Sequence, residues 1–245
     1  DGAGSVVRRG EESTAARGAH RIVWDLRHEA PIGADGQPSR RMRGRFVLPG
    51  SYQVRLTVAE RVQSRLFQVR MDPGLSVAAG GRRALDATLA LQADLVGTAA
   101  LSGSAVDTVL AQVGTVLESL TRQANASVAL TERARALEAE ARRLQVVLEG
   151  PGQGGIAQQE TVLPLSSLVT RLYSTTEAWT NRPTADQSRL TTRAHRDLVE
   201  LLSRLRPLLE RDLPGLRQAM AEAGVPWPAG DAPVLPDGLL PPFAR

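Results

Sequence analysis

The residue types that most often bind metals or carry out catalysis are few and widely separated in this sequence. Its histidines are His20, His28 and His195, and it contains no cysteine. None of the histidines has a second ligand at the spacing of a metal site, and without cysteine there is neither a thiolate ligand nor a thiolate nucleophile. We therefore interpret the three histidines as surface residues and expect no metal site.

Motifs for nucleophilic catalysis and for nucleotide binding are also missing. There is no Gly-x-Ser-x-Gly elbow, no Walker loop and no dinucleotide fingerprint. The glycine-rich run at 150–155 has no expected strand before it and no Lys-Ser/Thr pair after it, so it indicates a linker and not a phosphate cradle.

One acid and one basic patch are the remaining candidates. Asp25 lies beside Trp24 on an expected strand, but glycoside hydrolysis needs two carboxyl groups opposed across a cleft. A carboxylate that accepts a backbone hydrogen bond is the favoured interpretation. The basic patch at 40–45 has four arginines without interleaved aromatic rings, which favours a solvated loop over a phosphate site. We therefore predict no catalytic, cofactor-binding or metal-ligating residue, and no cofactor.

Composition narrows the class of protein further. The chain has 245 residues, of which 42% are hydrophobic, and all 30 of its basic residues are arginine against 26 acidic ones. That length and apolar content predict one or two domains with a buried core. Eight aromatic residues are too few for sugar-binding or base-stacking surfaces. The chain begins at Asp1 without a leader, and no apolar run approaches the ~18 residues of a membrane span, so we expect a soluble processed form or fragment.

Residues 1–75 have the alternating pattern of β-strands. Positions 20–26 alternate with Ile22, Trp24 and Leu26 on one face. After a turn at 48–50, positions 52–58 put Tyr52 and three aliphatic residues on one face, and a last strand follows with apolar residues at 67, 69 and 71. We expect these strands to form a small antiparallel Ig-like β-sandwich, the β part of an α+β protein.

The longest pattern in the chain runs from Leu85 to Leu120. Apolar or small residues recur there in alternating steps of four and three, and the rhythm stays in phase through the small residues at 97–104. This predicts one long helix at about 81–122, which needs partner helices along its length.

Three further helices are expected after it, at about 127–149, 163–179 and 184–221. The apolar face expected on the first of them is Leu130, Ala134, Leu137, Ala141, Leu144 and Leu148. The face expected on the second is Leu165, Leu168, Leu172, Thr175 and Trp179. A capping box at Thr184 and Gln187 should start the last of them, and Pro207 and Pro214 should kink it. With the long first helix they predict an up-down-up-down four-helix bundle over 76–222. Residues 223–245 are rich in proline and predict an extended tail.

Several stretches resemble a known family. They are 18–27, which contains Trp-Asp-Leu-Arg, 47–58, which contains Leu-Pro-Gly-Ser-Tyr, 69–73, 182–187 and 208–216. The first two resemble an Ig-like or fibronectin-type sandwich, and together the stretches resemble the C-terminal region of bacterial BNR-repeat proteins of the sortilin-like propeller type. At 59–62 the glycine-containing turn usual in that pattern is absent, which leaves the hairpin register open.

The resemblance implies a function for the parent protein more than for this chain. The Ser-x-Asp-x-Gly-x-x-Trp boxes of the propeller blades do not occur here, so no catalytic residue is carried over. We expect a non-catalytic C-terminal accessory module of a secreted, periplasmic or envelope-associated bacterial protein, which braces its own N-terminal propeller or docks a partner. One alternative is part of a sialidase-like glycoside hydrolase with its catalytic residues in the propeller, which would be favoured if Asp25, Glu29 or a loop arginine faced a deep pocket. The other is a free-standing helical interaction domain, which would be favoured by a large exposed apolar stripe. A nucleic-acid-binding protein is the least favoured of the alternatives.

Overall fold

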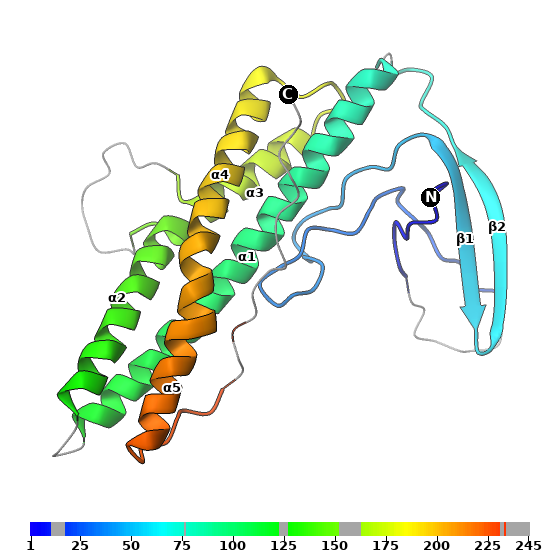
Figure 1. Ribbon diagram of the computed structural model, residues 1–245. Helices are drawn as coiled ribbons and strands as arrows, with labels where there is room; N and C mark the ends of the chain where they lie inside the picture. Colours follow the sequence, from blue (N-terminus) through cyan, green and yellow to red (C-terminus); the bar gives the residue numbers. More distant parts are fainter. Residues whose placement is uncertain (11–17, 76, 123–126, 152–162, 231–232, 234–245) are drawn as a thin grey trace.

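The computed structural model describes residues 1–10, 18–75, 77–122, 127–151, 163–230 and 233. Its elements in chain order are β1 (Gly50–Val58), β2 (Arg61–Val69), α1 (Ala79–Thr121), α2 (Val128–Glu149), α3 (Leu165–Glu177), α4 (Ala185–Pro207), the π-helix η1 (Leu208–Asp212) and α5 (Leu213–Glu222). Figure 1 shows a bundle of helices with a single β-hairpin projecting to one side.

The expected Ig-like sandwich is wrong. In the part of the chain that the structure describes, the only sheet is the antiparallel pair β1 and β2, so the fold is mainly helical. Residues 20–26 form no strand, and the side chain of Ile22 is 58% exposed. Alternation predicts a buried sheet face only where a second layer covers it, and the described residues form no such layer. Residues 18–49 are here called the docked segment, because its part from Arg27 to Arg45 contacts the helices.

The hairpin register is set by a two-residue turn. Val58 pairs with Arg61 and Gly50 pairs with Val69, so Ala59 and Glu60 form the turn. Ala59 has a φ of 52°, a left-handed conformation that costs an L-residue about 1 kcal/mol. The turn therefore forms without the expected glycine.

An aromatic cluster closes the base of the hairpin. The ring of Trp24 meets those of Tyr52 and Phe67 edge-on, with centroids 5.8 and 6.0 Å away. The indole N–H of Trp24 donates to the carbonyl of Arg27, and the Tyr52 hydroxyl donates to the carbonyl of Leu48. These contacts bury Tyr52, the one fully buried residue of β1.

Helix α1 is continuous through the small residues at 97–104 and extends for 43 residues, about 65 Å. It contacts α2, α3 and α4. Its innermost face is Thr88, Gln92, Leu95, Ala99, Ser102, Val106, Val109, Val113, Val116 and Leu120, all of which are buried. Half of these positions also belong to the seam expected from the sequence: Gln92, Ala99, Val106, Val113 and Leu120. Three other positions of that seam, Gly103, Leu110 and Leu117, are only half-buried. Three partner helices cover a wider stripe than the single narrow seam that we expected.

The up-down-up-down path is also wrong. Helices α2 and α3 both run antiparallel to α1, one after the other, and α4, η1 and α5 return parallel to it as one rod (Figure 1). Side-chain bonds agree with this order: Gln145 of α2 donates to Asp107 of α1, and Gln92 of α1 donates to Thr191 of α4. The bundle therefore consists of three rods of helix, here called legs: α1, then α2 followed by α3, then α4 with η1 and α5.

Most of the expected helix faces are found. The six residues expected on α2, Leu130, Ala134, Leu137, Ala141, Leu144 and Leu148, are all buried. The capping box of Thr184 and Gln187 at the start of α4 is confirmed. Helix α3 is rotated relative to the expectation, because Tyr173 is buried while Trp179, just past the helix, is 64% exposed.

The two prolines of the last leg flank the π-helix. Pro214 has no N–H, and in an α-helix its ring would collide with the carbonyl of residue 210. The wider turn of η1, in which the N–H of Leu213 donates to the carbonyl of Leu208, keeps the rod continuous across this point.

The rod ends at Gly224, whose φ is 69°. The N–H of Val225 bonds to the carbonyl of Met220, which is the bond of a Schellman cap, and Val225 is buried against the core. Nearly all of the expected tail beyond 230, and residues 152–155 of the glycine run, lie outside the described residues.

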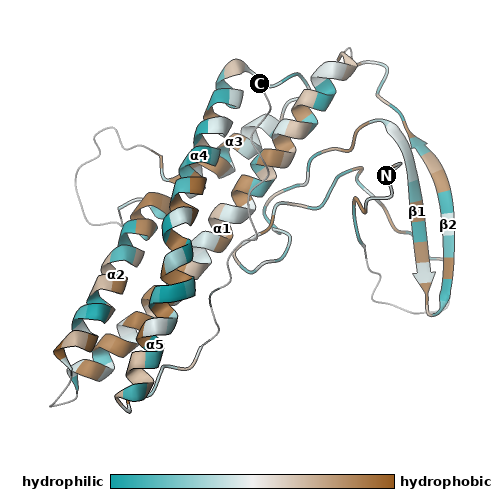
Figure 2. Cartoon of the chain, viewed as in Figure 1, coloured by the Kyte–Doolittle hydropathy of each residue, from teal (hydrophilic) through white to brown (hydrophobic). Residues whose placement is uncertain are grey.

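The core differs between the two ends of the bundle. Where α2 packs against α1 and α5, most of the buried residues are leucine, valine and alanine, together with Met220 of α5. The same half of α1 also buries Gln112. Figure 2 colours many residues of these helices brown, for hydrophobic. Where α1, α3 and α4 meet, the interior also holds Thr88, Gln92, Ser102, Thr176 and Thr191. Gln92 Oε1, Ser102 Oγ and Thr176 Oγ1 have no hydrogen-bond partner among the described residues. We call these the α2 end and the α3 end of the bundle.

By length and composition alone α1 could cross a membrane, although the sequence has no long purely apolar run. The central helix of a bundle in water meets the same criterion, and the innermost face of α1 is covered by α2, α3 and α4. This property therefore assigns no membrane role.

Two glycines of α1 offer a test of how the docked segment meets the bundle. A Cβ at Gly97 would lie 3.3 Å from the Cβ of Ile32, whereas a Cβ at Gly114 would meet nothing within 4 Å. Replacing a helical glycine by alanine in open space stabilises a protein by about 1 kcal/mol. We expect Gly114→Ala to show this gain in the free energy of unfolding, measured with denaturant, and Gly97→Ala to lack it because Ile32 must move. Equal gains would show that Ile32 does not pack on Gly97.

Candidate functional site

The docked segment is fastened to the bundle through a buried arginine. Arg27 is 7% exposed, and its guanidinium pairs with the carboxylate of Glu177 on α3. The same guanidinium donates to the carbonyl of Gly44 at 2.7 Å and lies over the ring of Phe46, 3.6 Å from its centroid. A buried charge is tolerated only when it is paired and hydrogen-bonded. Glu177 therefore determines where Arg27, and the segment with it, can lie.

Two further bonds join the segment to the helices. The guanidinium of Arg45 pairs with Asp86 of α1 at 2.7 Å. The hydroxyl of Tyr173, which is buried on α3, donates to the carbonyl of Arg43 at 2.6 Å. Arg27, Arg45 and Tyr173 thus attach one loop to two different helices.

The segment folds back on itself at this point. The N–H of His28 donates to the carbonyl of Arg45, and the N–H of Val47 donates to the carbonyl of Leu26. A Cβ at Gly44 would lie 1.9 Å from the carbonyl oxygen of His28. Only glycine permits this close approach.

Burial shifts the pKa values of two side chains beside these attachments. Burial and the nearby Arg45 guanidinium lower the pKa of His28. Burial, and after it the negative charge of Glu177, raise the pKa of Tyr173 to about 12. Both shifts favour the neutral form. His28 and Tyr173 therefore add no charge to an interface that already holds two ion pairs.

The candidate residues from the sequence do not converge on one site. The Asp25 carboxylate accepts the N–H of Arg27 at 3.2 Å, the backbone role that we favoured. Glu29 accepts the N–H of Arg9. Of the basic patch, Arg45 pairs with Asp86 while Arg40 and Arg41 are exposed.

The histidines lie apart as well, with His20 and His28 in the docked segment and His195 on α4. Among the residues that the structure describes, no group of three histidines or carboxylates is placed to hold a metal ion.

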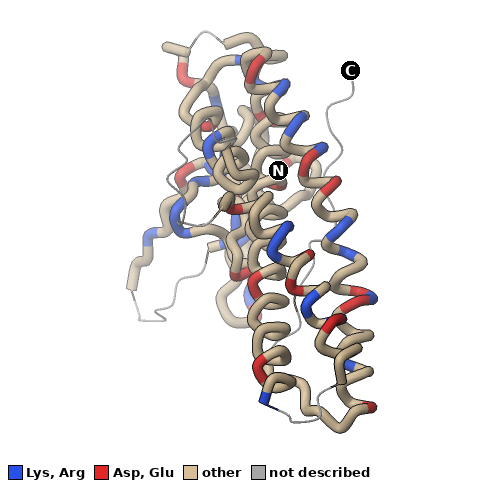
Figure 3. Tube along the Cα trace, turned by 90° about the vertical axis from the view of Figure 1, so that its left-hand side faces the viewer, with Lys and Arg blue, Asp and Glu red and all other residues tan. Residues whose placement is uncertain are grey.

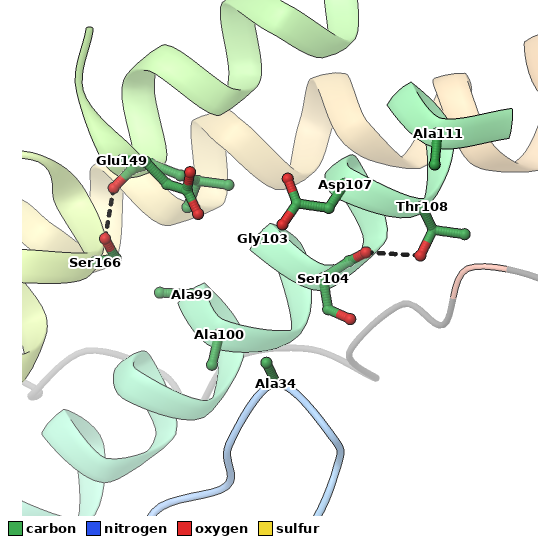
Figure 4. A pocket seen from close by; sticks show the side chains of 11 residues that line it. Ala34, Ala99, Ala100, Gly103, Ser104, Asp107, Thr108, Ala111, Glu149 and Ser166 are labelled. Carbon is green, nitrogen blue, oxygen red and sulfur yellow. Dashed lines mark hydrogen bonds between the residues drawn. The ribbon is translucent and has the colours of Figure 1, made fainter. Parts of the chain in front are cut away.

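Sequence reasoning missed one cavity. It has a volume of about 490 Å³ and lies between α1, the loop at Ala34 and the facing ends of α2 and α3 (Figure 4). Its acidic side chains are Asp107 and Glu149, both exposed to solvent. The hydroxyl of Ser166 beside them donates to the carbonyl of Leu148. Neither Asp25, Glu29 nor an arginine lines this cavity, so it does not join the candidate acids or the basic patch into an active site.

The sequence signal for this cavity was the run of small residues at 97–104, which we considered only as a break in the helix. Those residues leave room between α1 and the loop at Ala34.

Charges along the bundle are balanced locally. Figure 3 shows arginines and carboxylates interspersed on the helices, and many of them pair, as Arg142 does with Glu138 and Arg204 with Glu140. Such interspersed pairs do not make the one-sided basic stripe that nucleic-acid binding requires.

Removing the charge of Glu177 tests the attachment. In Glu177→Gln, Arg27 stays buried without its counter-charge, which costs about 3 kcal/mol. We expect that loss in the free energy of unfolding, and faster hydrogen exchange at the His28 and Val47 amides.

The matched control is Glu138→Gln. It breaks the surface pair with Arg142, whose side chain is 63% exposed, and should change stability by at most about 0.5 kcal/mol. If both variants cost the same, the ion pair of Arg27 does not hold the segment.

Tyr173 gives a prediction for alkaline pH. Its folded pKa of about 12 lies above the unfolded value of about 10. Its contribution to stability is therefore fully present below about pH 10 and is lost as pH rises through about 12.

Tyr173→Phe should abolish that loss. It should also cost about 1 kcal/mol at neutral pH, because the carbonyl of Arg43 loses its donor. The measurement is the difference in unfolding free energy between the two proteins from about pH 8 to pH 11. A constant difference would contradict the assignment.

No family model matches the chain, and neither does any curated protein or solved structure in the comparisons. The resemblance to the C-terminal region of sortilin-like propeller proteins therefore stays a prediction.

Proposed function

We propose that this chain is a non-catalytic module in which a helical bundle holds out a β-hairpin for docking to another polypeptide. The observation that carries the proposal is the exposure of large apolar side chains on the hairpin. Each of them is between 49% and 78% exposed: Val54, Leu56, Val58, Val62 and Leu66.

Such an apolar surface has a physical cost. Two strands alone are marginally stable in water. Val54, Leu56 and Val58 lie on one face of the hairpin and Val62 and Leu66 on the other, and exposed apolar residues gathered on one element commonly mark an interaction site. The described residues supply no second layer of a sandwich to cover either face. Cover from another polypeptide explains why this hairpin keeps valine and leucine on its surface.

The attachments of the docked segment support the same role. The ion pairs of Arg27 and Arg45 and the hydroxyl of Tyr173 are already used to fix the base of the hairpin to the bundle. Polar groups engaged in this way serve as fasteners, and this supports a role without catalysis.

The setting that we propose is a C-terminal accessory module of a secreted or envelope-associated bacterial propeller protein. Support for it comes from the resemblance alone, at Trp-Asp-Leu-Arg and Leu-Pro-Gly-Ser-Tyr. In the structure these two motifs supply Trp24, Arg27 and Tyr52, which build the base of the hairpin. In this setting the module is joined to its own propeller, and the hairpin docks a separate polypeptide.

Site-specific photo-crosslinking tests the proposal. A photoreactive amino acid replaces Leu56 on the hairpin in one variant and Val199 on α4 in the other, because these side chains are almost equally exposed, 49% and 47%. In the cells of origin we expect one discrete cross-linked polypeptide from position 56 and none from position 199. The reverse pattern would favour a helical interaction domain, and no cross-link at position 56 would overturn the proposal.

A further inference from the structure

Within the part of the chain that the structure describes, strand β2 has an open outer edge. The sheet consists of β1 and β2 alone, and no backbone hydrogen bond from the described residues outside the pair reaches either strand. At β1 the chain already comes close, because a Cβ on Gly2 would lie 3.7 Å from the carbonyl oxygen of Ser51. The unpaired N–H and C=O groups of β2 form a template for a further strand.

The two faces of β2 differ in chemistry. The register with β1 puts Arg61, Gln63 and Arg65 on one face and Val62, Ser64 and Leu66 on the other. Neither arginine makes an ion pair within the described part of the chain. Leu66 is 78% exposed and Val62 is 59% exposed.

We propose that this edge takes up an extended segment of a different polypeptide, in which acidic and apolar residues alternate. Side chains of an added strand alternate between the two faces. On one face its carboxylates lie beside Arg61 and Arg65, and on the other its apolar residues cover Val62 and Leu66. This inference rests on the proposed docking function and specifies its partner.

A second copy of the chain fits this edge poorly. Antiparallel pairing of two β2 strands about a two-fold axis keeps the same face on the same side, so arginines would lie beside arginines. Like charges directly opposite each other in a sheet are destabilising, and β2 carries no acid to offset them.

Binding of two designed peptides to the full chain tests the proposal, with fluorescence anisotropy as the measurement. One peptide alternates glutamate with valine and the other alternates lysine with valine, each nine residues long to match β2. We expect the glutamate peptide to bind at least about tenfold more tightly, because two charge pairs change sign between the peptides. Equal binding of both peptides would overturn the proposal.

Charge reversal identifies the surface. The double variant Arg61→Glu with Arg65→Glu should reverse the preference between the two peptides. The control, Arg83→Glu with Arg217→Glu, changes the net charge equally at exposed arginines of α1 and α5 and should leave the preference unchanged. If both double variants act alike, the arginines of β2 are not the contact.

Backbone bonding is tested separately. A glutamate–valine peptide with all of its backbone amides N-methylated keeps its charges but has no N–H group to donate to the carbonyls of β2. We expect it to lose most of its binding, and retained binding would overturn strand addition.

Three other outcomes would overturn this inference. The first is a dimer of the chain in sedimentation that the β2 double variant disrupts, and the second is binding to anionic lipid vesicles but to neither peptide. The third is failure of the glutamate peptide together with a cross-link at position 56. That result refutes strand addition but leaves hairpin docking standing, so the two proposals fail separately.

Discussion

The length of α1 is the constraint on which the rest of the structure depends. A single helix of 43 residues with a wide apolar stripe is stable only if that stripe is covered along about 65 Å. Neither α2 with 22 residues nor α3 with 13 is long enough alone. Placed one after the other they match α1, while α4 packs against α1 and α3, and α5 packs against α2. The three-legged form follows from this requirement.

Sequence patterns predicted the helices well because a helix face and a helix cap depend on residues only three or four positions apart. The buried face of α2 could be read from its spacing, since its six buried residues repeat in steps of four and three, and the capping box at Thr184 depends on residues only three apart. The path of the chain could not be read in this way. After a glycine-rich break the next helix can run back along the previous one or continue in the same direction. Which of these occurs depends on the surfaces against which the next helix packs, and the spacing of its apolar residues does not reveal them.

The β part failed for a related physical reason. Alternation at 20–26 and 52–58 describes a strand with two different faces, but it does not say whether a second sheet exists to bury one of them. The attachments were also beyond sequence reasoning, because Arg27 and Glu177 lie 150 positions apart. The interpretation of Asp25 as a backbone acceptor could be made in advance because its partner is two residues away.

The uneven core of the bundle has a consequence for how the molecule opens. A buried polar atom that lacks a partner lowers stability by about 1–3 kcal/mol. Among the described residues Gln92 and Thr176, at the α3 end, and Ser102, at the middle of α1, have such atoms. Because cooperative units with the weakest cores open first, we expect subglobal opening to begin at the α3 end. Arg27 and Arg45 are anchored at that same end, on Glu177 and Asp86. The orientation of the hairpin therefore depends on the α3 end being folded. A mechanical force that pulls on the hairpin is transmitted first to the α3 end, through the ion pairs of Arg27 and Arg45.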